Sequence, residues 1–164
     1  MNRLEGKKAL VTGGGSGIGA AISRELAAQE AKVVIHYFQS SANAEKLAKE
    51  ISAAGGEAHT FKADLTREED IKNLFRFIED LWEELDILVN NAGMQFVSPV
   101  EDFPPEKWDM IIALNLTASF HTIRHAVPGM RKKGWGRIIA TASAHSLVAS
   151  PFKSAYVTAK HGLA

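Results

Sequence analysis

Short apolar runs alternate with helical patterns along the whole chain. Five of these runs have the length and composition of buried strands. They cover residues 7–12, 32–37, 58–63, 86–89 and 137–141. Apolar residues at helical spacing predict helices after Gly19, over 42–54, from Thr66 to Leu81, and over much of 106–133. Buried strands that alternate with amphipathic helices predict a doubly wound parallel sheet, the three-layer α/β/α Rossmann fold.

Local signals mark where several of these helices begin and end. Thr66-x-x-Glu69 has the form of a capping box and predicts a helix start. Gly55-Gly56 predicts a helix end, and Gly134 interrupts the long helical region. No such signal closes the last helix before Ala164. We therefore expect residues 1–164 to be a single domain that is incomplete at its C-terminus and nearly inactive alone.

The composition removes several classes of function. Nineteen Lys and Arg balance nineteen Asp and Glu, and no basic cluster predicts a nucleic-acid partner. The absence of cysteine excludes disulfides, thiolate metal sites and cysteine nucleophiles. No apolar run is long enough to span a bilayer, so we expect a cytoplasmic protein without membrane contact. His121 and His125 lie four residues apart without a third ligand, so we predict no metal site.

A glycine-rich turn joins the first strand to the first helix. It runs from Gly13 to Gly19, and this arrangement directs backbone N–H groups and a helix N-terminus at a pyrophosphate. Glycine allows the close approach that such contacts need. No lysine follows Gly19, which excludes the phosphate loop of nucleotide triphosphatases. The alternative is a tight turn without a ligand.

Polar residues follow three other strands at the same edge of the predicted sheet. Ligands of doubly wound sheets bind outside the carboxyl ends of the strands. Asp64 and Leu65 follow the third strand, Asn91-Ala92-Gly93 follows the fourth, and Ser143 follows the fifth. The sequence thus predicts one site at this edge.

Tyr156 and Lys160 complete the candidate chemistry. Residues four apart lie on one face of a helix. An ammonium group near a phenol favours the phenolate and lowers the phenol pKa. Such a pair can act as a general acid and base at neutral pH, although the pattern alone also occurs on exposed helices.

Five motifs occur here in the order typical of one enzyme family. They are Thr12-Gly-x-x-x-Gly17-x-Gly19, Asn90-Asn91-Ala92-Gly93, Asn115, Ser143 and Tyr156-x-x-x-Lys160. In these motifs the chain resembles the short-chain dehydrogenase/reductase family. The resemblance implies that Tyr156 transfers the substrate proton, that Lys160 assists it and binds the nicotinamide ribose, and that Ser143 donates to the substrate oxygen. It also implies that Asn115 holds a water that links Lys160 to solvent.

The same resemblance implies a nicotinamide dinucleotide cofactor. Its predicted contacts are Gly13, Ser16, Gly17, Ile18, Gly19, Phe38, Asp64, Leu65, Asn91, Ala92, Gly93, Tyr156 and Lys160. The second strand ends at Tyr37-Phe38, with neither the acidic residue of many NAD enzymes nor an arginine for the 2′-phosphate of NADP. This uncharged rim favours NAD over NADP.

Two further stretches narrow the resemblance within the family. Residues 95–108 and 143–156 are similar to the bacterial D-3-hydroxybutyrate dehydrogenases, in which a Gln, a His and a Lys hold the substrate carboxylate. These residues map onto Gln95, His145 and Lys153, and an amide with two potential cations suits a small carboxylate. The resemblance implies oxidation of D-3-hydroxybutyrate to acetoacetate by a homotetramer.

Other functions remain open on the sequence alone. An NADPH-dependent 3-oxoacyl or other secondary-alcohol reductase would use the same catalytic residues. A non-catalytic dinucleotide-binding scaffold would share the fold. His145 and Lys153 could also be ordinary loop residues, one a hydrogen-bonding partner and the other a solvated charge.

Overall fold

The computed structural model describes residues 4–164 and contains one parallel sheet of five strands in the order β3-β2-β1-β4-β5. The strands are β1 (Lys8–Val11), β2 (Lys32–Tyr37), β3 (Ala58–Lys62), β4 (Ile87–Asn90) and β5 (Arg137–Ala140). Every strand pair is parallel. The predicted strands and the doubly wound fold are confirmed.

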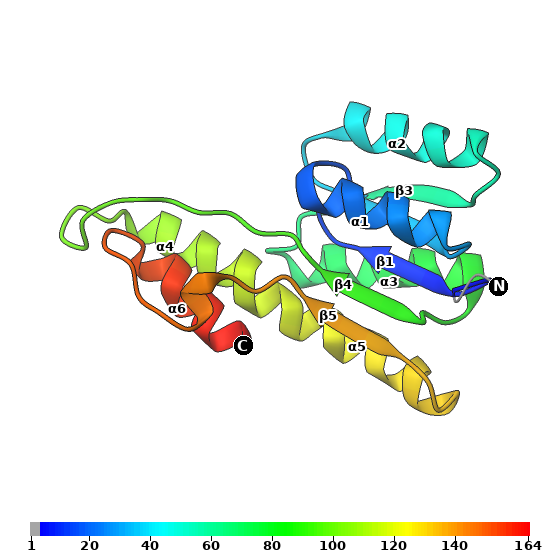
Figure 1. The fold of residues 1–164 in the computed structure, drawn as a ribbon. Helices are drawn as coiled ribbons and strands as arrows, with labels where there is room; N and C mark the ends of the chain where they lie inside the picture. Colours follow the sequence, from blue (N-terminus) through cyan, green and yellow to red (C-terminus); the bar gives the residue numbers. More distant parts are fainter. Residues whose placement is uncertain (1–3) are drawn as a thin grey trace.

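Helices cover both faces of the sheet, as Figure 1 shows. They are α1 (Gly17–Ala28), α2 (Ser41–Ala53), α3 (Glu68–Trp82), α4 (Pro105–Ile112), α5 (Ala118–Lys132) and α6 (Ser154–Leu163). Two short elements, the π-helical η1 (Ala113–Thr117) and the 3₁₀-helical η2 (Ala144–Ser146), complete the chain.

Alternation along the strands divides the core between the two faces. Successive strand side chains point to opposite faces of a sheet. Leu10 of β1 and Leu88 of β4 pack in the cluster that includes α3 and α5. Val11 and Val89, the next residues on these strands, pack in the cluster that includes α1 and α2. Because both faces are covered, the strands are continuous apolar runs, as the sequence predicted.

One predicted helix start is wrong. The helix begins at Glu68, and the preceding Arg67 makes no side-chain cap. The Thr66 hydroxyl donates instead to Asp64 Oδ1 at 2.7 Å, and the Thr66 backbone N–H donates to the same oxygen at 3.0 Å. Thr66 lies inside a turn closed by the Arg67 N–H, which donates to the Asp64 carbonyl at 3.0 Å, so Thr66 precedes the N-cap and does not cap α3.

Helices α4 and α6 lie beyond the sheet, where the loop after β4 extends past the strands (Figure 1). Ile111 of α4 and Ala155 and Ala159 of α6 are buried in a third cluster, against which Leu116 of η1 packs. The helical region predicted over 106–133 is confirmed, but η1 interrupts it with a π-helical turn. This packing holds α6 near the carboxyl ends of the strands.

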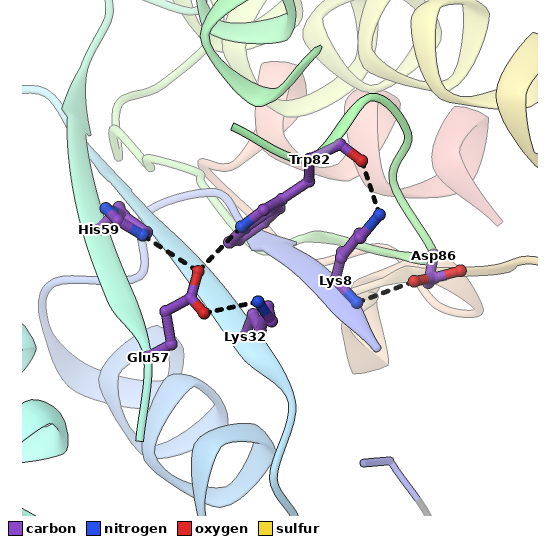
Figure 2. Close-up of polar contacts among 6 residues, drawn as sticks. All are labelled: Lys8, Lys32, Glu57, His59, Trp82 and Asp86. Atoms are coloured by element: carbon purple, nitrogen blue, oxygen red, sulfur yellow. Dashed lines mark hydrogen bonds and ion pairs between the residues drawn. The ribbon is translucent and has the colours of Figure 1, made fainter. Parts of the chain in front are cut away.

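A polar network joins the opposite, amino ends of the strands (Figure 2). The Glu57 carboxylate accepts from Lys32 Nζ at 2.7 Å and from Trp82 Nε1 at 2.9 Å, and His59 Nε2 lies 3.2 Å away. Lys8 Nζ donates to the Trp82 carbonyl at 2.6 Å, and the Lys8 backbone N–H donates to Asp86 at 2.9 Å. These contacts connect β1, β2 and β3 with the end of α3.

Candidate active site

The glycine-rich turn lies at the carboxyl end of β1, and its conformation and packing require glycine at several positions. Gly13 has a φ of +62° and Gly17 a φ of +51°, both in the left-handed region that favours glycine. A Cβ on Gly19 would collide with the Gly13 carbonyl and the Asn91 side chain. The turn therefore needs glycine for its backbone conformation and for its packing.

The same turn presents free donors suited to a pyrophosphate. The first N–H groups of a helix have no intrahelical acceptor, and within residues 4–164 no other acceptor engages those of Gly17 and Ile18. Ser16 precedes α1, is exposed and makes no side-chain cap, so its hydroxyl is also available. The first turn of α1 carries no acidic residue that would repel an anion. These residues fit the phosphates of a dinucleotide.

Thr12 connects the glycine turn to the segment after β4. Its Oγ1 accepts from the backbone N–H groups of Asn91 at 2.9 Å and Ala92 at 3.0 Å. The Asn91 side chain donates back to the Thr12 carbonyl at 3.0 Å. A Cβ on Gly93 would lie 3.2 Å from Asn115 Oδ1, so the segment also packs tightly against η1. The predicted Asn91-Ala92-Gly93 contacts thus lie beside the predicted phosphate site.

Three other predicted cofactor residues have different surroundings. Phe38, just after β2, is about half exposed, and Asp64 is half-buried at the end of β3. Leu65 is only 4% exposed and packs in the core with α3 and α5. Only the backbone of Leu65 can therefore face a ligand.

Tyr156 and Lys160 lie on one face of α6, as predicted. Lys160 is 5% exposed, and its Nζ lies 5.8 Å from the centroid of the Tyr156 ring. The ammonium donates to the carbonyl of Thr141, just after β5, at 2.6 Å. Burial lowers the pKa of Lys160 below its ordinary value. A partly desolvated ammonium of this kind strengthens electrostatic effects on a nearby phenol.

Ser143 is held by a short 3₁₀ helix that sequence reasoning missed. Its Oγ accepts from the backbone N–H of His145 at 3.2 Å, and its own N–H donates to Ser146 Oγ at 3.3 Å. The His145 ring meets the Tyr156 ring edge to face, with centroids 6.0 Å apart. Ser143, His145 and Tyr156 are therefore brought together.

Of the three predicted carboxylate ligands, the structure pairs two. Lys153 Nζ lies 3.3 Å from His145 Nε2. Gln95 is exposed in the loop after β4, and among residues 4–164 no hydrogen bond joins it to either residue. The loop is nevertheless tied to the start of α6, because the Ser98 N–H donates to the Phe152 carbonyl at 2.9 Å.

Asn115 occupies the centre of the π-helical turn and is 1% exposed. Its Oδ1 accepts from the Met94 N–H and its Nδ2 donates to the Met94 carbonyl, both at 2.8 Å. The side chain therefore anchors the loop after β4. Its predicted role in holding a water stays a prediction.

The described part of the chain contains neither a metal cluster nor a membrane span. In residues 4–164 no three His, Cys, Asp or Glu side chains are grouped as metal ligands, His121 and His125 included. No described helix combines the length and apolarity needed to cross a bilayer.

One buried residue of the site was missed from the sequence. His36 of β2 is 2% exposed and its Nδ1 accepts from the Gly13 N–H at 3.0 Å. The only sequence signal was a lone histidine within an otherwise apolar strand.

Comparison with known proteins agrees with this geometry. The family model for short chain dehydrogenases matches residues 7–164. The chain is 52% identical over 158 residues to a protein of Rhizobium meliloti (strain 1021) named D-beta-hydroxybutyrate dehydrogenase, covering 96% of this chain and 61% of that protein. It is 51% identical over 162 residues to a protein of the same name from Cupriavidus necator, covering 98% and 62%. The chain thus spans about three-fifths of the length of these curated relatives.

A solved structure shows the same fold. The crystal structure of a metagenomic short-chain oxidoreductase in complex with NADP has a TM-score of 0.94 and 35% identity. The similarity covers 98% of this chain and 72% of that one. With the family match and the geometry of the site, these similarities establish that the chain belongs to the short-chain dehydrogenase family.

Proposed function

We propose that the protein is an NAD-dependent dehydrogenase that interconverts D-3-hydroxybutyrate and acetoacetate. The observation that carries this substrate is the contact between Lys153 and His145 beside Tyr156. The names of the two relatives that are 52% and 51% identical support the same substrate.

The catalytic roles follow from the contacts within the chain. NAD, when bound, supplies the hydride chemistry. Tyr156 takes the substrate hydroxyl proton during oxidation and returns it during reduction. The buried ammonium of Lys160, held by the Thr141 carbonyl, lies beside the Tyr156 ring and would stabilise negative charge on the Tyr156 oxygen during proton transfer. Ser143 Oγ already accepts a bond from the His145 N–H, so its O–H is free to donate to the substrate oxygen.

The proposed carboxylate site is based on the Lys153 ammonium group, which has no carboxylate partner in the described part of the chain. Within residues 4–164, Lys153 forms no ion pair with Asp or Glu. Its nearest polar contact, His145 Nε2, is neutral or positive, so an anion between Lys153 and Tyr156 would be stabilised. Gln95 can add an amide donor from the loop after β4.

The test separates substrate binding from chemistry. In the full-length protein, Lys153→Met should raise the KM for D-3-hydroxybutyrate about tenfold or more, while the Kd of NADH stays within about twofold. Lys49→Met, at an exposed position on α2, is the matched control and should change neither. An unchanged KM in Lys153→Met would contradict the carboxylate site.

An NADPH-dependent reductase is the second candidate, because the similar solved structure contains NADP. Against it, the exposed rim from Phe38 to Ser40 offers no Arg or Lys to a 2′-phosphate. The ratio of kcat/KM for NAD to that for NADP separates the two candidates. A ratio below one would favour the reductase.

The predicted homotetramer and cytoplasmic location also belong to this proposal. Phe120 of α5 is 61% exposed, so a subunit interface on this helix would cover its ring. Sedimentation of the full-length protein tests the tetramer.

A further inference from the structure

His36 connects two segments of the site through one buried ring. It lies near the end of β2, and its Nδ1 accepts from the Gly13 N–H at 3.0 Å. Its Nε2 lies 3.0 Å from the carbonyl oxygen of Ala63, the residue before Asp64. The backbone carbonyl of His36 also accepts from the Gly14 N–H at 2.9 Å.

These two partners determine the tautomer of the ring. The Gly13 N–H can only donate, so Nδ1 must be unprotonated and Nε2 must carry the hydrogen that the Ala63 carbonyl accepts. Burial lowers the pKa of His36 to about 4, although the bond to Ala63 and the nearby Asp64 charge act in the opposite direction. The ring is therefore neutral at physiological pH.

The contacts of His36 also determine which donors remain for a ligand. The N–H groups of Gly13 and Gly14 are both engaged by His36, one by the ring and one by its carbonyl. Within residues 4–164 no acceptor engages the N–H groups from Gly15 to Gly19, which include those of Gly17 and Ile18 at the start of α1. His36 thus fixes the first half of the turn against β2 and leaves the second half to face an anion.

We infer that His36 is a positioning residue for dinucleotide binding, which orients the glycine turn through the Gly13 N–H while its Nε2–H holds the segment before Asp64. This inference rests on the proposed dinucleotide site. His36 would thus shape the turn from strand β2 without contacting the ligand itself.

Three substitutions separate the two bonds of the ring. His36→Asn keeps an acceptor near the position of Nδ1 and loses the reach to Ala63. His36→Gln keeps a donor near the position of Nε2 and loses the acceptor for Gly13, and His36→Leu loses both. His59→Asn, on the neighbouring strand β3 and outside the site, is the matched control.

The first readout is the Kd of NADH, measured by titration of the full-length protein. We expect His36→Leu and His36→Gln to weaken binding about tenfold, because the Gly13 N–H loses its acceptor in a buried site. His36→Asn and the control should bind within about twofold of the original protein. Equal binding by the Asn and Gln variants would overturn the inference, and this comparison remains valid if His36→Leu fails to fold.

The second readout needs no cofactor. Nitrogen chemical shifts of the His36 ring should show protonated Nε2 and unprotonated Nδ1, and the Gly13 amide should exchange faster with solvent in His36→Gln than in His36→Asn. A protonated Nδ1 would overturn the inference even if NADH binds. Failure of the original protein to bind either NADH or NADPH would instead contradict the proposed function, while the ring shifts still decide the tautomer.

Discussion

The two ends of the parallel sheet use polar residues in opposite ways. At the amino ends, Glu57 has three side-chain partners, and Asp86 accepts from the Lys8 backbone N–H (Figure 2). Asp86 also forms an ion pair with Lys133. At the carboxyl ends, Lys153 has no carboxylate partner, and His145 Nδ1 is buried with no hydrogen-bond partner in the described chain. Buried polar groups in folded proteins are almost always partnered.

A cluster of charges is therefore not by itself a functional site. A groove between the ends of α1 and α2 is lined by the ion pairs Arg24–Glu50 and Lys32–Glu57. Four of its five charged side chains are paired with one another, and among the described residues only Glu30 has no ion-pair partner. The groove therefore offers a ligand one exposed carboxylate and no free cation. The candidate active site instead brings together several groups without carboxylate or carbonyl partners among the described residues, including the Lys153 ammonium and the N–H groups of Gly17 and Ile18.

The largest effect is expected from Tyr156→Phe at the carboxyl end. Loss of the acid/base hydroxyl should lower kcat by a factor of roughly 10² to 10⁴, while the Kd of NADH stays within about twofold. Steady-state kinetics and an NADH titration measure the two quantities. Retained turnover in a variant that binds NADH would refute the role of Tyr156.

A smaller effect on the same chemistry is expected from Lys160→Met. Without the buried ammonium the site loses the positive charge beside the Tyr156 ring, so kcat should fall by roughly 10². Steady-state kinetics measure this loss, and urea unfolding checks that the variant is folded. An unchanged kcat would mean that Lys160 acts only as packing.

A substitution at the amino ends of the strands should change the free energy of unfolding and leave the Kd of NADH unchanged. Trp82→Phe removes the indole N–H that Glu57 accepts, and should lower the free energy of unfolding by about 1–2 kcal/mol. Urea unfolding and an NADH titration of the same sample measure both properties. A weakened Kd at unchanged stability would contradict the division between the two ends.

The smallest effect concerns acid stability. Burial raises the pKa of Asp86, but Lys133 and the Lys8 N–H outweigh it and hold the pKa below its usual value. A depressed carboxyl pKa stabilises the fold above about pH 4 and loses that contribution as the pH falls through the folded value. Between roughly pH 6 and pH 2 the free energy of unfolding decreases as Asp86 is protonated. Lys133→Met should make this decrease smaller by about 1 kcal/mol, as measured by urea unfolding. An unchanged pH dependence would exclude this pair as its source.

The fold and the order of the motifs were predictable because they depend on local patterns. Fully buried strands are continuous apolar runs, and the residues that follow them occupy the carboxyl edge whatever the details of packing. The strand ends alone therefore predicted that the glycine turn, Asp64, Asn91 and Ser143 share one edge of the sheet, whereas the place of Tyr156 in the site was implied by the family resemblance.

The missed features depend on contacts between distant residues. No sequence spacing relates His36 to both Gly13 and Ala63, because the sheet alone brings β2 beside the first turn. The π-helical turn accompanies the pair of bonds between Asn115 and Met94, which lie 21 residues apart. The predicted cap at Thr66 is wrong because the turn from Asp64 to Arg67 places Thr66 before the N-cap, a displacement that the capping pattern does not encode.

The central claim is that the unpaired donors of the carboxyl end bind NAD and a small hydroxy acid. NADH formation by the full-length protein tests it most directly, with D-3-hydroxybutyrate, its L enantiomer and NADP compared in parallel. The account predicts activity with the D form and NAD and little with the L form or with NADP. Activity confined to NADP(H) and uncharged or thioester ketones would contradict it, and would return Gln95, His145 and Lys153 to the status of loop residues.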